Sequence, residues 1–267
     1  MRIYGVDFTS APRRAKPITI ASGVLRKDVL HLEDIEKHES FTSFEAFLQR
    51  PGPWLGGFDF PFGLPRELVR DLGWPARWKA LVAHCSRMDR LEFRRVLDAY
   101  RATRPVGNKY AHRATDLPAG SSSPMKLVNP PVALMFHEGA PRLLAAGVHV
   151  PALADGDPKR VALEAYPGLL MRKQLGIRGS YKSDTRAEHT PARRVIRKQI
   201  VDALCAGRPL GIAIFVDKKQ ENLLIEDGSG DLLDAAICAV QAAWAARWPR
   251  YGLPDKVARA EGWIISA

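Results

Sequence analysis

Cysteine is scarce in this chain of 267 residues. The three cysteines, Cys85, Cys205 and Cys238, are widely spaced and form no Cys-x-x-Cys pair. An odd number of isolated cysteines argues against a disulfide framework and against a zinc ribbon. The sequence is therefore typical of a protein of a reducing compartment, and we expect it in the cytoplasm.

Long hydrophobic runs are also missing. The most apolar long stretch, residues 232–246, is interrupted by Asp234 and Gln241, which makes it too short and too polar to span a bilayer. The chain enters the apolar residues 3–8 almost at once, without the layout of a secretory signal peptide. We therefore expect no membrane association.

Several common catalytic motifs are absent. The histidines show neither the His-x-x-x-His nor the His-Glu-x-x-His spacing of zinc hydrolases. There is no Gly-x-Gly-x-x-Gly dinucleotide motif, no phosphate-binding P-loop and no Gly-x-Ser-x-Gly elbow. Zinc hydrolysis, dinucleotide redox chemistry and serine-hydrolase chemistry gain no support.

Positive charge is what the sequence has in excess. It contains 40 lysines and arginines against 29 aspartates and glutamates, a net charge of +11. Such a surface attracts polyanions, and nucleic acid is the expected partner. The cations are spread along the chain, with local clusters at residues 13–16, 87–95 and 193–198. Solvated arginine-rich helices would give the same net charge, so charge alone does not establish nucleic-acid binding.

The first 60 residues predict the start of a mixed sheet. Apolar or alternating patterns indicate strands at 2–8, 17–24, 29–32 and 54–60, and a short helix over 43–48 with Thr42 or Ser43 as its N-cap. Three strands, a helix and a fourth strand is the opening of a ribonuclease-H-like sheet.

The middle of the chain breaks this rhythm. Residues 65–159 are mainly helical in pattern, with helices over 66–72, 76–84 and 89–100 and two shorter ones over 133–136 and 141–146. We interpret them as an insertion that either caps one end of the sheet or forms a separate lobe.

After the insertion the strand and helix patterns resume. They predict a strand over 161–165, a basic helix over 191–206, a strand or helix over 209–216, a helix over 231–246 and a short strand over 262–266. The predicted fold is α/β: one ribonuclease-H-like domain over residues 1–267, with a mixed central sheet flanked by helices.

Carboxylates at the ends of these elements are the most informative residues. Asp7 and Asp59 lie in apolar strands, Glu164 interrupts the apolar run 161–165, and Asp231 and Asp234 share one face of the last long helix. A charge in a buried strand is costly unless it is paired or bound to a metal. All-oxygen ligands favour Mg²⁺ or Mn²⁺. Two such ions about 4 Å apart can hold a phosphodiester, activate a water and stabilise the leaving oxygen.

Each carboxylate also has a structural interpretation. Asp7 could cap a loop, Asp59 could stabilise the turn before Pro61, and Asp231 suits the N-cap or first turn of its helix. Asp234 is harder to explain structurally because its neighbours are apolar. Their shared placement at strand ends and a helix start favours a convergent cluster.

Four short segments carry a resemblance to a known family. They are GVDFTSAP at 5–12, GFDFPFG at 57–63, LEAYPG at 163–168 and DLLDAAICA at 231–239. Together with residues 129–141, their order and spacing resemble the family called domain of unknown function 429 over residues 4–263. That family is regarded as a predicted nuclease of the ribonuclease-H-like superfamily.

The resemblance implies roles for four of the acids. By similarity to the Holliday-junction-resolvase branch of the superfamily, Asp7 matches the first-strand acid and Asp59 the fourth-strand acid, where that branch usually has Glu. Asp231 and Asp234 match its paired helix acids. The shorter Asp at position 59 changes the reach to a metal.

These observations lead to one main hypothesis. We expect a Mg²⁺- or Mn²⁺-dependent nuclease that acts on DNA or RNA, with Asp7, Asp59 and Asp234 as catalytic metal ligands and Asp231 or Glu164 completing the set. Candidate phosphate ligands, which a solvated polar loop would explain equally well, are Arg104, Lys109, Arg113 and Lys182. Further candidate acids are Asp116 and Glu138.

Two alternatives stay open at this point. The run Asp7-Phe8-Thr9-Ser10 resembles the phosphate loop of sugar kinases and actin-like ATPases, which would make the protein an ATP-dependent phosphotransferase. Those loops usually carry glycine where this chain has Phe8, and those enzymes use two core copies. The other alternative is a non-catalytic module that binds nucleic acid or protein through its basic surface.

Overall fold

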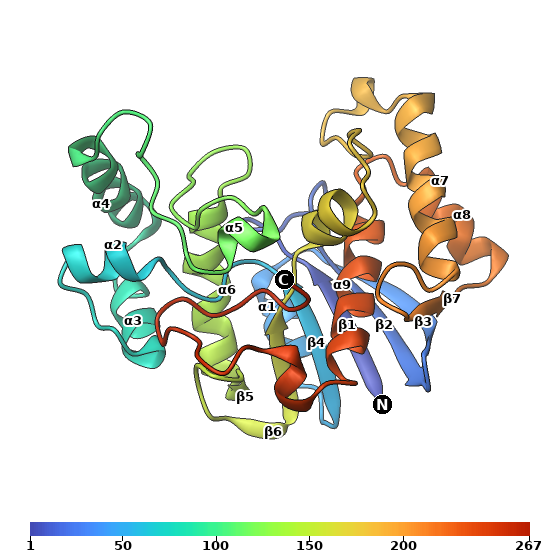
Figure 1. Cartoon of the computed structure of the whole chain (residues 1–267), viewed down its shortest axis with the longest axis horizontal. Coiled ribbons are helices and arrows are strands. Elements are labelled where there is room, and N and C mark those ends of the chain that lie inside the picture. The colour runs from blue at the N-terminus through green and yellow to red at the C-terminus, as the bar shows by residue number, and fades with distance from the viewer.

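A computed structural model describes residues 1–267 and contains a mixed seven-stranded sheet in the order β5-β6-β4-β1-β2-β3-β7 (Figure 1). β1 pairs antiparallel with β2, and β2 with β3, whereas the other neighbours are parallel. The predicted α/β architecture, a central sheet flanked by helices, is confirmed. The strands are β1 (Arg2–Asp7), β2 (Ile18–Arg26), β3 (Val29–His38), β4 (Trp54–Asp59), β5 (Val148–His149), β6 (Asp157–Glu164) and β7 (Ala213–Phe215).

Alternation along β1 divides the interior into two cores. Tyr4 and Val6 face one side of the sheet and belong to an aromatic-rich core, whereas Ile3 belongs to the core on the other side. Successive strand residues point to opposite faces, so Gly5 and Asp7 share the side of Ile3. A buried carboxylate therefore lies on the aliphatic face of the sheet.

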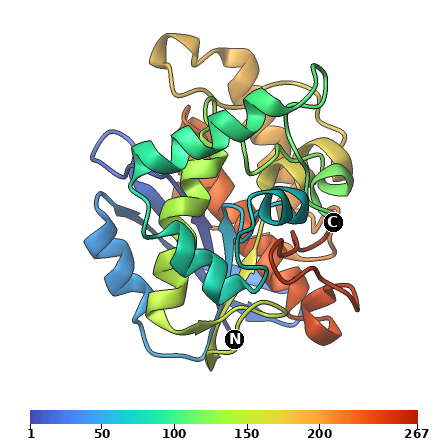
Figure 2. The ribbon, with the colours of Figure 1, turned by 90° about the vertical axis from the view of Figure 1, so that its left-hand side faces the viewer.

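The aromatic-rich face is covered by α1 (Phe41–Leu48) and by helices from the middle of the chain (Figure 2). Phe47 of α1 packs edge-on against Tyr4, with ring centroids 4.9 Å apart. The middle helices share this core with β1 and β4, and β5 and β6 join the edge of the sheet. They are α2 (Arg66–Asp71), α3 (Trp78–Cys85), α4 (Arg90–Thr103) and α6 (Val132–Ala146). The short helix α5 (Asp116–Ala119) lies outside this core, and its Ala119 packs with Leu169 and Ile264.

The aliphatic face is covered by α9 (Asp231–Ala245), which lies in front of β1 in Figure 1. Beyond the edge at β7 lie α7 (Pro191–Cys205) and α8 (Lys218–Glu226), which pack against each other. No helix combines the length and the apolar character that crossing a membrane requires.

Several local predictions differ from the structure. Helix α1 begins at Phe41, because the side chain of Ser40 accepts the Ser43 N–H at 3.2 Å and caps the helix two residues early. The two short helices predicted over 133–146 are one helix, α6. The helix continues through Gly139 and Pro141, and Gly139 makes room there for the ring of Phe60.

The C-terminal third differs in three further places. Within 209–216 only Ala213–Phe215 forms a strand, and residues 262–266 contribute a single bridge between Ile264 and Glu164 instead of a strand. Helix α8 was not predicted, although Asp217 and Gln220 form a capping box at its start.

Candidate metal centre

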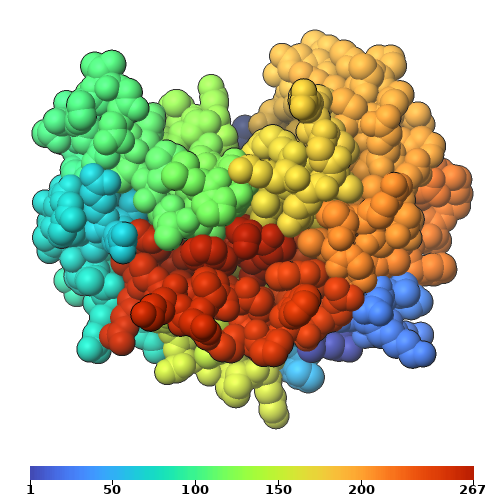
Figure 3. Space-filling model, viewed as in Figure 1, coloured from blue at the N-terminus to red at the C-terminus, as the bar shows by residue number.

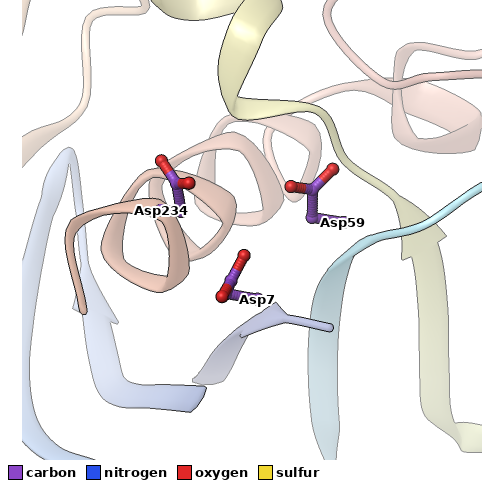
Figure 4. Close-up of side chains that lie close together, drawn as sticks. All are labelled: Asp7, Asp59 and Asp234. Carbon is purple, nitrogen blue, oxygen red and sulfur yellow. The ribbon is translucent and has the colours of Figure 1, made fainter. Parts of the chain in front are cut away.

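Two aspartates lie side by side at the ends of adjacent strands. In the parallel pair β1–β4, Asp7 is in register with Asp59, and both are the last residues of their strands. Asp234, in the first turn of α9, lies across from Asp59, with Asp7 between and below them in Figure 4. One carboxylate oxygen from each residue lies within 4.8 Å of the others. The structure therefore brings together the three residues predicted to be catalytic.

Glycine sets the distance between α9 and the two strands. Gly5 and Gly57 are also in register, two residues before Asp7 and Asp59 and on the same face. A Cβ atom at Gly5 would clash with the backbone of Ala235 and Ala239, and one at Gly57 would lie 2.5 Å from the Cys238 carbonyl oxygen. The repeated Gly-x-Asp pattern thus allows the helix backbone to touch the sheet.

Burial makes this group of carboxylates electrostatically costly. Asp234 is fully buried and Asp7 is 8% exposed. Burial, with added repulsion from Asp231 and Asp234, raises the pKa of Asp7 well above its usual range. Burial and the charge of Asp234 raise the pKa of Asp59 to about 7. The cluster therefore favours protons or a cation near neutral pH.

Lys182 supplies one positive charge to this cluster. Its ammonium group donates to one oxygen of Asp234, and the hydroxyl of Tyr181 donates to the other. The side chain of Lys182 is partly exposed, and desolvation of its ammonium group at the cluster would lower its pKa. The carboxylates of Asp234 and Asp7 nevertheless raise that pKa well above its usual value. A Cβ atom at Gly230 would lie 2.6 Å from that of Lys182, so glycine there makes room for the lysine.

The fourth aspartate, Asp231, has a different partner. Its carboxylate accepts from Lys16 at 2.8 Å, and Lys16 also donates to Asp184 at 2.6 Å. Asp231 lies in the first turn of α9 but is not among the three converging carboxylates. Lys16 thus joins three separate segments beside the cluster.

Glu164 lies on the opposite side of the sheet. It is in register with Phe58, one residue short of Asp59, so the alternation of β6 turns its side chain away from α9. Its oxygens accept from the Arg113 guanidinium at 2.7 and 2.8 Å and from the Phe62 N–H at 2.9 Å. The structure thus places Glu164 in a buried ion pair, outside the aspartate cluster.

Three of the four candidate phosphate ligands are engaged elsewhere. Arg113 is buried and forms ion pairs with both Glu164 and Asp116. Its guanidinium nitrogen lies 2.9 Å from a carboxylate oxygen of Asp116. Arg104 is paired with Glu67 at 2.8 Å, and Lys109 donates to the Arg104 carbonyl. Neither Arg104 nor Lys109 lines the cleft described below. Their positions in loops and near helix ends gave no signal of these partners.

The two further acids predicted from the sequence are also paired. Asp116 belongs to the Arg113 cluster. Glu138 accepts from Arg90 at 2.8 Å and from Arg142 at 2.9 Å. Both acids therefore lie in ion pairs away from the three aspartates.

An open cleft of about 1000 Å³ leads to the aspartates. The hollow between the green and the gold segments at the top of Figure 3 marks its position. Lys182 lines it, as do three cations whose side chains form neither an ion pair nor a hydrogen bond: Arg13, Lys126 and Arg178. Arg172 also lines the cleft without an ion pair, but it donates to the Tyr166 hydroxyl and the Gly120 carbonyl. Sequence reasoning did not select the first three as phosphate ligands: Arg13 belongs to the basic cluster at residues 13–16, but nothing local distinguishes Lys126 and Arg178 from other surface cations.

Comparison with known families places the chain in one of them. A family model described as "Protein of unknown function (DUF429)" matches residues 5–259. The chain therefore belongs to this family, as its four segments predicted. No curated protein and no solved structure matches it.

Proposed function

We propose that this member of the DUF429 family is a divalent-metal-dependent nuclease that hydrolyses phosphodiester bonds of nucleic acid. The observation that carries the proposal is the convergence of Asp7, Asp59 and Asp234 at an open cleft with unpaired cations on its walls. Carboxylates that repel one another in a buried place gain most from a bound cation.

The donor atoms fit Mg²⁺ or Mn²⁺. All three come from carboxylates, with no histidine or cysteine among them, which suits a hard cation better than zinc. Lys182 brings a single positive charge to Asp234, which leaves negative charge on the cluster for a metal ion to bind. When bound, one or two such ions would supply a Lewis acid and an activated water.

The sheet order supports a finer proposal about the fold. β1, β2 and β3 form an antiparallel meander, β4 lies parallel to β1 on its other side, and β6 lies parallel to β4. We infer a ribonuclease-H-like core from this order, with the acids at the carboxyl ends of the first and fourth strands and on the last long helix.

Nucleic acid is the proposed substrate because of the charge around the cluster. The chain carries a net charge of +11, and Arg13, Lys126 and Arg178 line the cleft without carboxylate partners. Cations in such positions bind backbone phosphates without reading sequence. They would hold the strand while the three aspartates hold the metal.

A cleavage assay tests this function. End-labelled single-stranded, duplex and branched DNA and RNA would be incubated with Mg²⁺, Mn²⁺ or EDTA. We expect metal-dependent cleavage by the wild type and only background cleavage by Asp7→Asn, Asp59→Asn and Asp234→Asn. Asp155→Asn, which removes a fully exposed carboxylate, is the matched control. Full activity of Asp7→Asn would contradict the proposal.

A non-catalytic binding module is the second candidate. The observation in its favour is that Lys182 and Lys16 already pair with Asp234 and Asp231 within the chain. In that case nucleic-acid affinity falls as salt rises but is the same in Mn²⁺ and in EDTA. Binding isotherms measured in both conditions separate the two candidates.

A further inference from the structure

Lys182 is the one cation that contacts the aspartate cluster directly. Its ammonium donates to an oxygen of Asp234, while its side chain is 42% exposed and lines the cleft. The residue thus lies between the buried carboxylates and the open space. A divalent cation bound by Asp7, Asp59 and Asp234 would come close to a resident positive charge.

We propose, on the basis of the metal site proposed above, that Lys182 is a built-in counter-cation that competes with the divalent metal for Asp234. Without metal, its ammonium neutralises part of the cluster. With metal bound, it is released from Asp234 into the cleft. Lys182 therefore sets the metal affinity of the site.

The contacts around Lys182 allow this exchange with little rearrangement. Hydrogen bonds fix the backbone on both sides of Lys182. The Tyr181 carbonyl accepts from the Arg197 guanidinium at 2.7 Å, and the Ser183 N–H donates to the Gly228 carbonyl at 3.1 Å. The lysine side chain itself has no hydrogen-bond partner other than Asp234. Release thus requires rotation of one flexible side chain within an anchored loop.

Neither neighbouring donor is suited to this role. Tyr181 is neutral, and a carboxylate oxygen accepts more than one partner, so its hydroxyl can keep its bond to Asp234 beside a metal. Lys16 is charged and acts on Asp7 through space, but the oxygens that it contacts belong to Asp231 and Asp184, outside the converging group. Direct competition with a metal for an oxygen of the cluster therefore falls to Lys182.

Calorimetric titration with Mn²⁺ tests the proposal. We expect Lys182→Met to bind Mn²⁺ about tenfold more tightly than the wild type, because an adjacent like charge is removed. Lys182→Arg, which keeps the charge, should not gain affinity. Lys126→Met is the matched control: it removes a cleft lysine that contacts no carboxylate, and its effect should be much smaller. Circular dichroism melts verify that the variants are folded.

The possible results separate this proposal from the proposed function. If the wild type binds Mn²⁺ and Lys182→Met binds no more tightly, the counter-cation proposal is overturned while the metal site stands. If neither protein binds Mn²⁺, both proposals fail.

Lysine reactivity provides a readout that needs no variant. The intact protein would be acylated briefly with and without Mn²⁺, and the modified lysines quantified by peptide mass spectrometry. We expect acylation of Lys182 to rise on Mn²⁺ binding, because its ammonium leaves Asp234, while that of Lys126 stays constant. Unchanged reactivity of Lys182 at saturating Mn²⁺ would show that it is not displaced.

Discussion

At the scale of single residues, the three aspartates repel one another when ionised, and only a cation or protons remove this electrostatic repulsion. Asp7 and Asp59 lie next to each other in register, and Asp234 faces them from the helix. Burial raises the pKa of both strand aspartates, that of Asp59 to about 7. Such a cluster is expected to lower the free energy of unfolding of the metal-free protein, as residues of binding sites often do.

Asp59→Asn should stabilise the metal-free protein in a pH-dependent way. The folded-state pKa of Asp59 lies above the unfolded value of 3.8, so its contribution to stability is present below that value and is lost as pH rises through about 7. Asparagine does not titrate. In EDTA the variant should exceed the wild type by about 1–3 kcal/mol at pH 8 and by little near pH 4. Urea unfolding at both pH values measures this difference.

The control for this experiment is Asp155→Asn, because the side chain of Asp155 is fully exposed. It should change the free energy of unfolding little at either pH. A stability gain of Asp59→Asn that is the same at both pH values would contradict the electrostatic explanation.

Arg113 and Lys126 should behave as opposites, although both are cationic residues near the cleft. Arg113→Gln leaves Glu164 and Asp116 buried without their cation, so we expect a loss of about 3–5 kcal/mol in the free energy of unfolding. Lys126→Gln should leave stability unchanged and weaken oligonucleotide binding. Chemical denaturation and fluorescence anisotropy measure the two effects. A stable Arg113→Gln protein with weakened oligonucleotide binding would make Arg113 a phosphate ligand instead.

At the scale of elements, the site depends on how closely α9 approaches the sheet. Gly5 and Gly57 leave no side chain between the strands and the helix, and the helix face above them is rich in alanine. The first turn of α9 is thereby held over the ends of β1 and β4. The position of Asp234 is thus a consequence of backbone packing several residues away.

Gly5→Ala should damage both stability and metal binding. The new Cβ meets backbone atoms of Ala235 and Ala239, which cannot rotate away, so α9 must shift. We expect a loss of about 3 kcal/mol or more in the free energy of unfolding and weaker Mn²⁺ binding by the folded fraction. Gly56→Ala is the matched control, because its Cβ would meet only side chains of its own strand, the nearest 2.7 Å away. Equal losses in the two variants would show that the approach of α9 is not the cause.

The elements that the sequence predicted best are those with strong periodic patterns. Strands β1, β2 and β4 and helices α2, α3, α4 and α9 lie close to their predicted ranges, whereas β3 continues six residues beyond its predicted end at residue 32. The errors occur where tertiary contacts outweigh local signals. Helix α6 continues past Gly139 because that glycine packs against Phe60, and the apolar run 209–216 forms only a short edge strand beside β3.

At the scale of the whole molecule, the cleft is built from segments far apart in the chain. Its walls come from the loop after β1, residues 121–135 and residues 164–184, with Asp234 at its base. The sequence predicted the three converging aspartates because each interrupts an apolar element. It could not predict that Glu164 turns to the opposite face, since strand register decides that. Nor could it select the unpaired cations.

The salt dependence of nucleic-acid binding should reflect those cations. Three phosphate contacts from Arg13, Lys126 and Arg178 predict a slope of log K against log salt of about −2 for a single strand. Changing all three to Gln should flatten this slope. The control carries Lys27→Gln, Lys37→Gln and Lys256→Gln, which remove the same charge outside the cleft. If the control flattens the slope as much, the net charge of the molecule, and not the cleft, governs binding.

The most direct test of the metal centre is a calorimetric titration of Mn²⁺ into the wild type and into the Asp7→Asn/Asp234→Asn double variant. We expect the wild type to bind with release of protons, because the metal displaces them from Asp7 and Asp59, and the double variant not to bind. Equal binding by both proteins would place the metal elsewhere. No binding by the wild type would contradict the metal-dependent function proposed for this cluster.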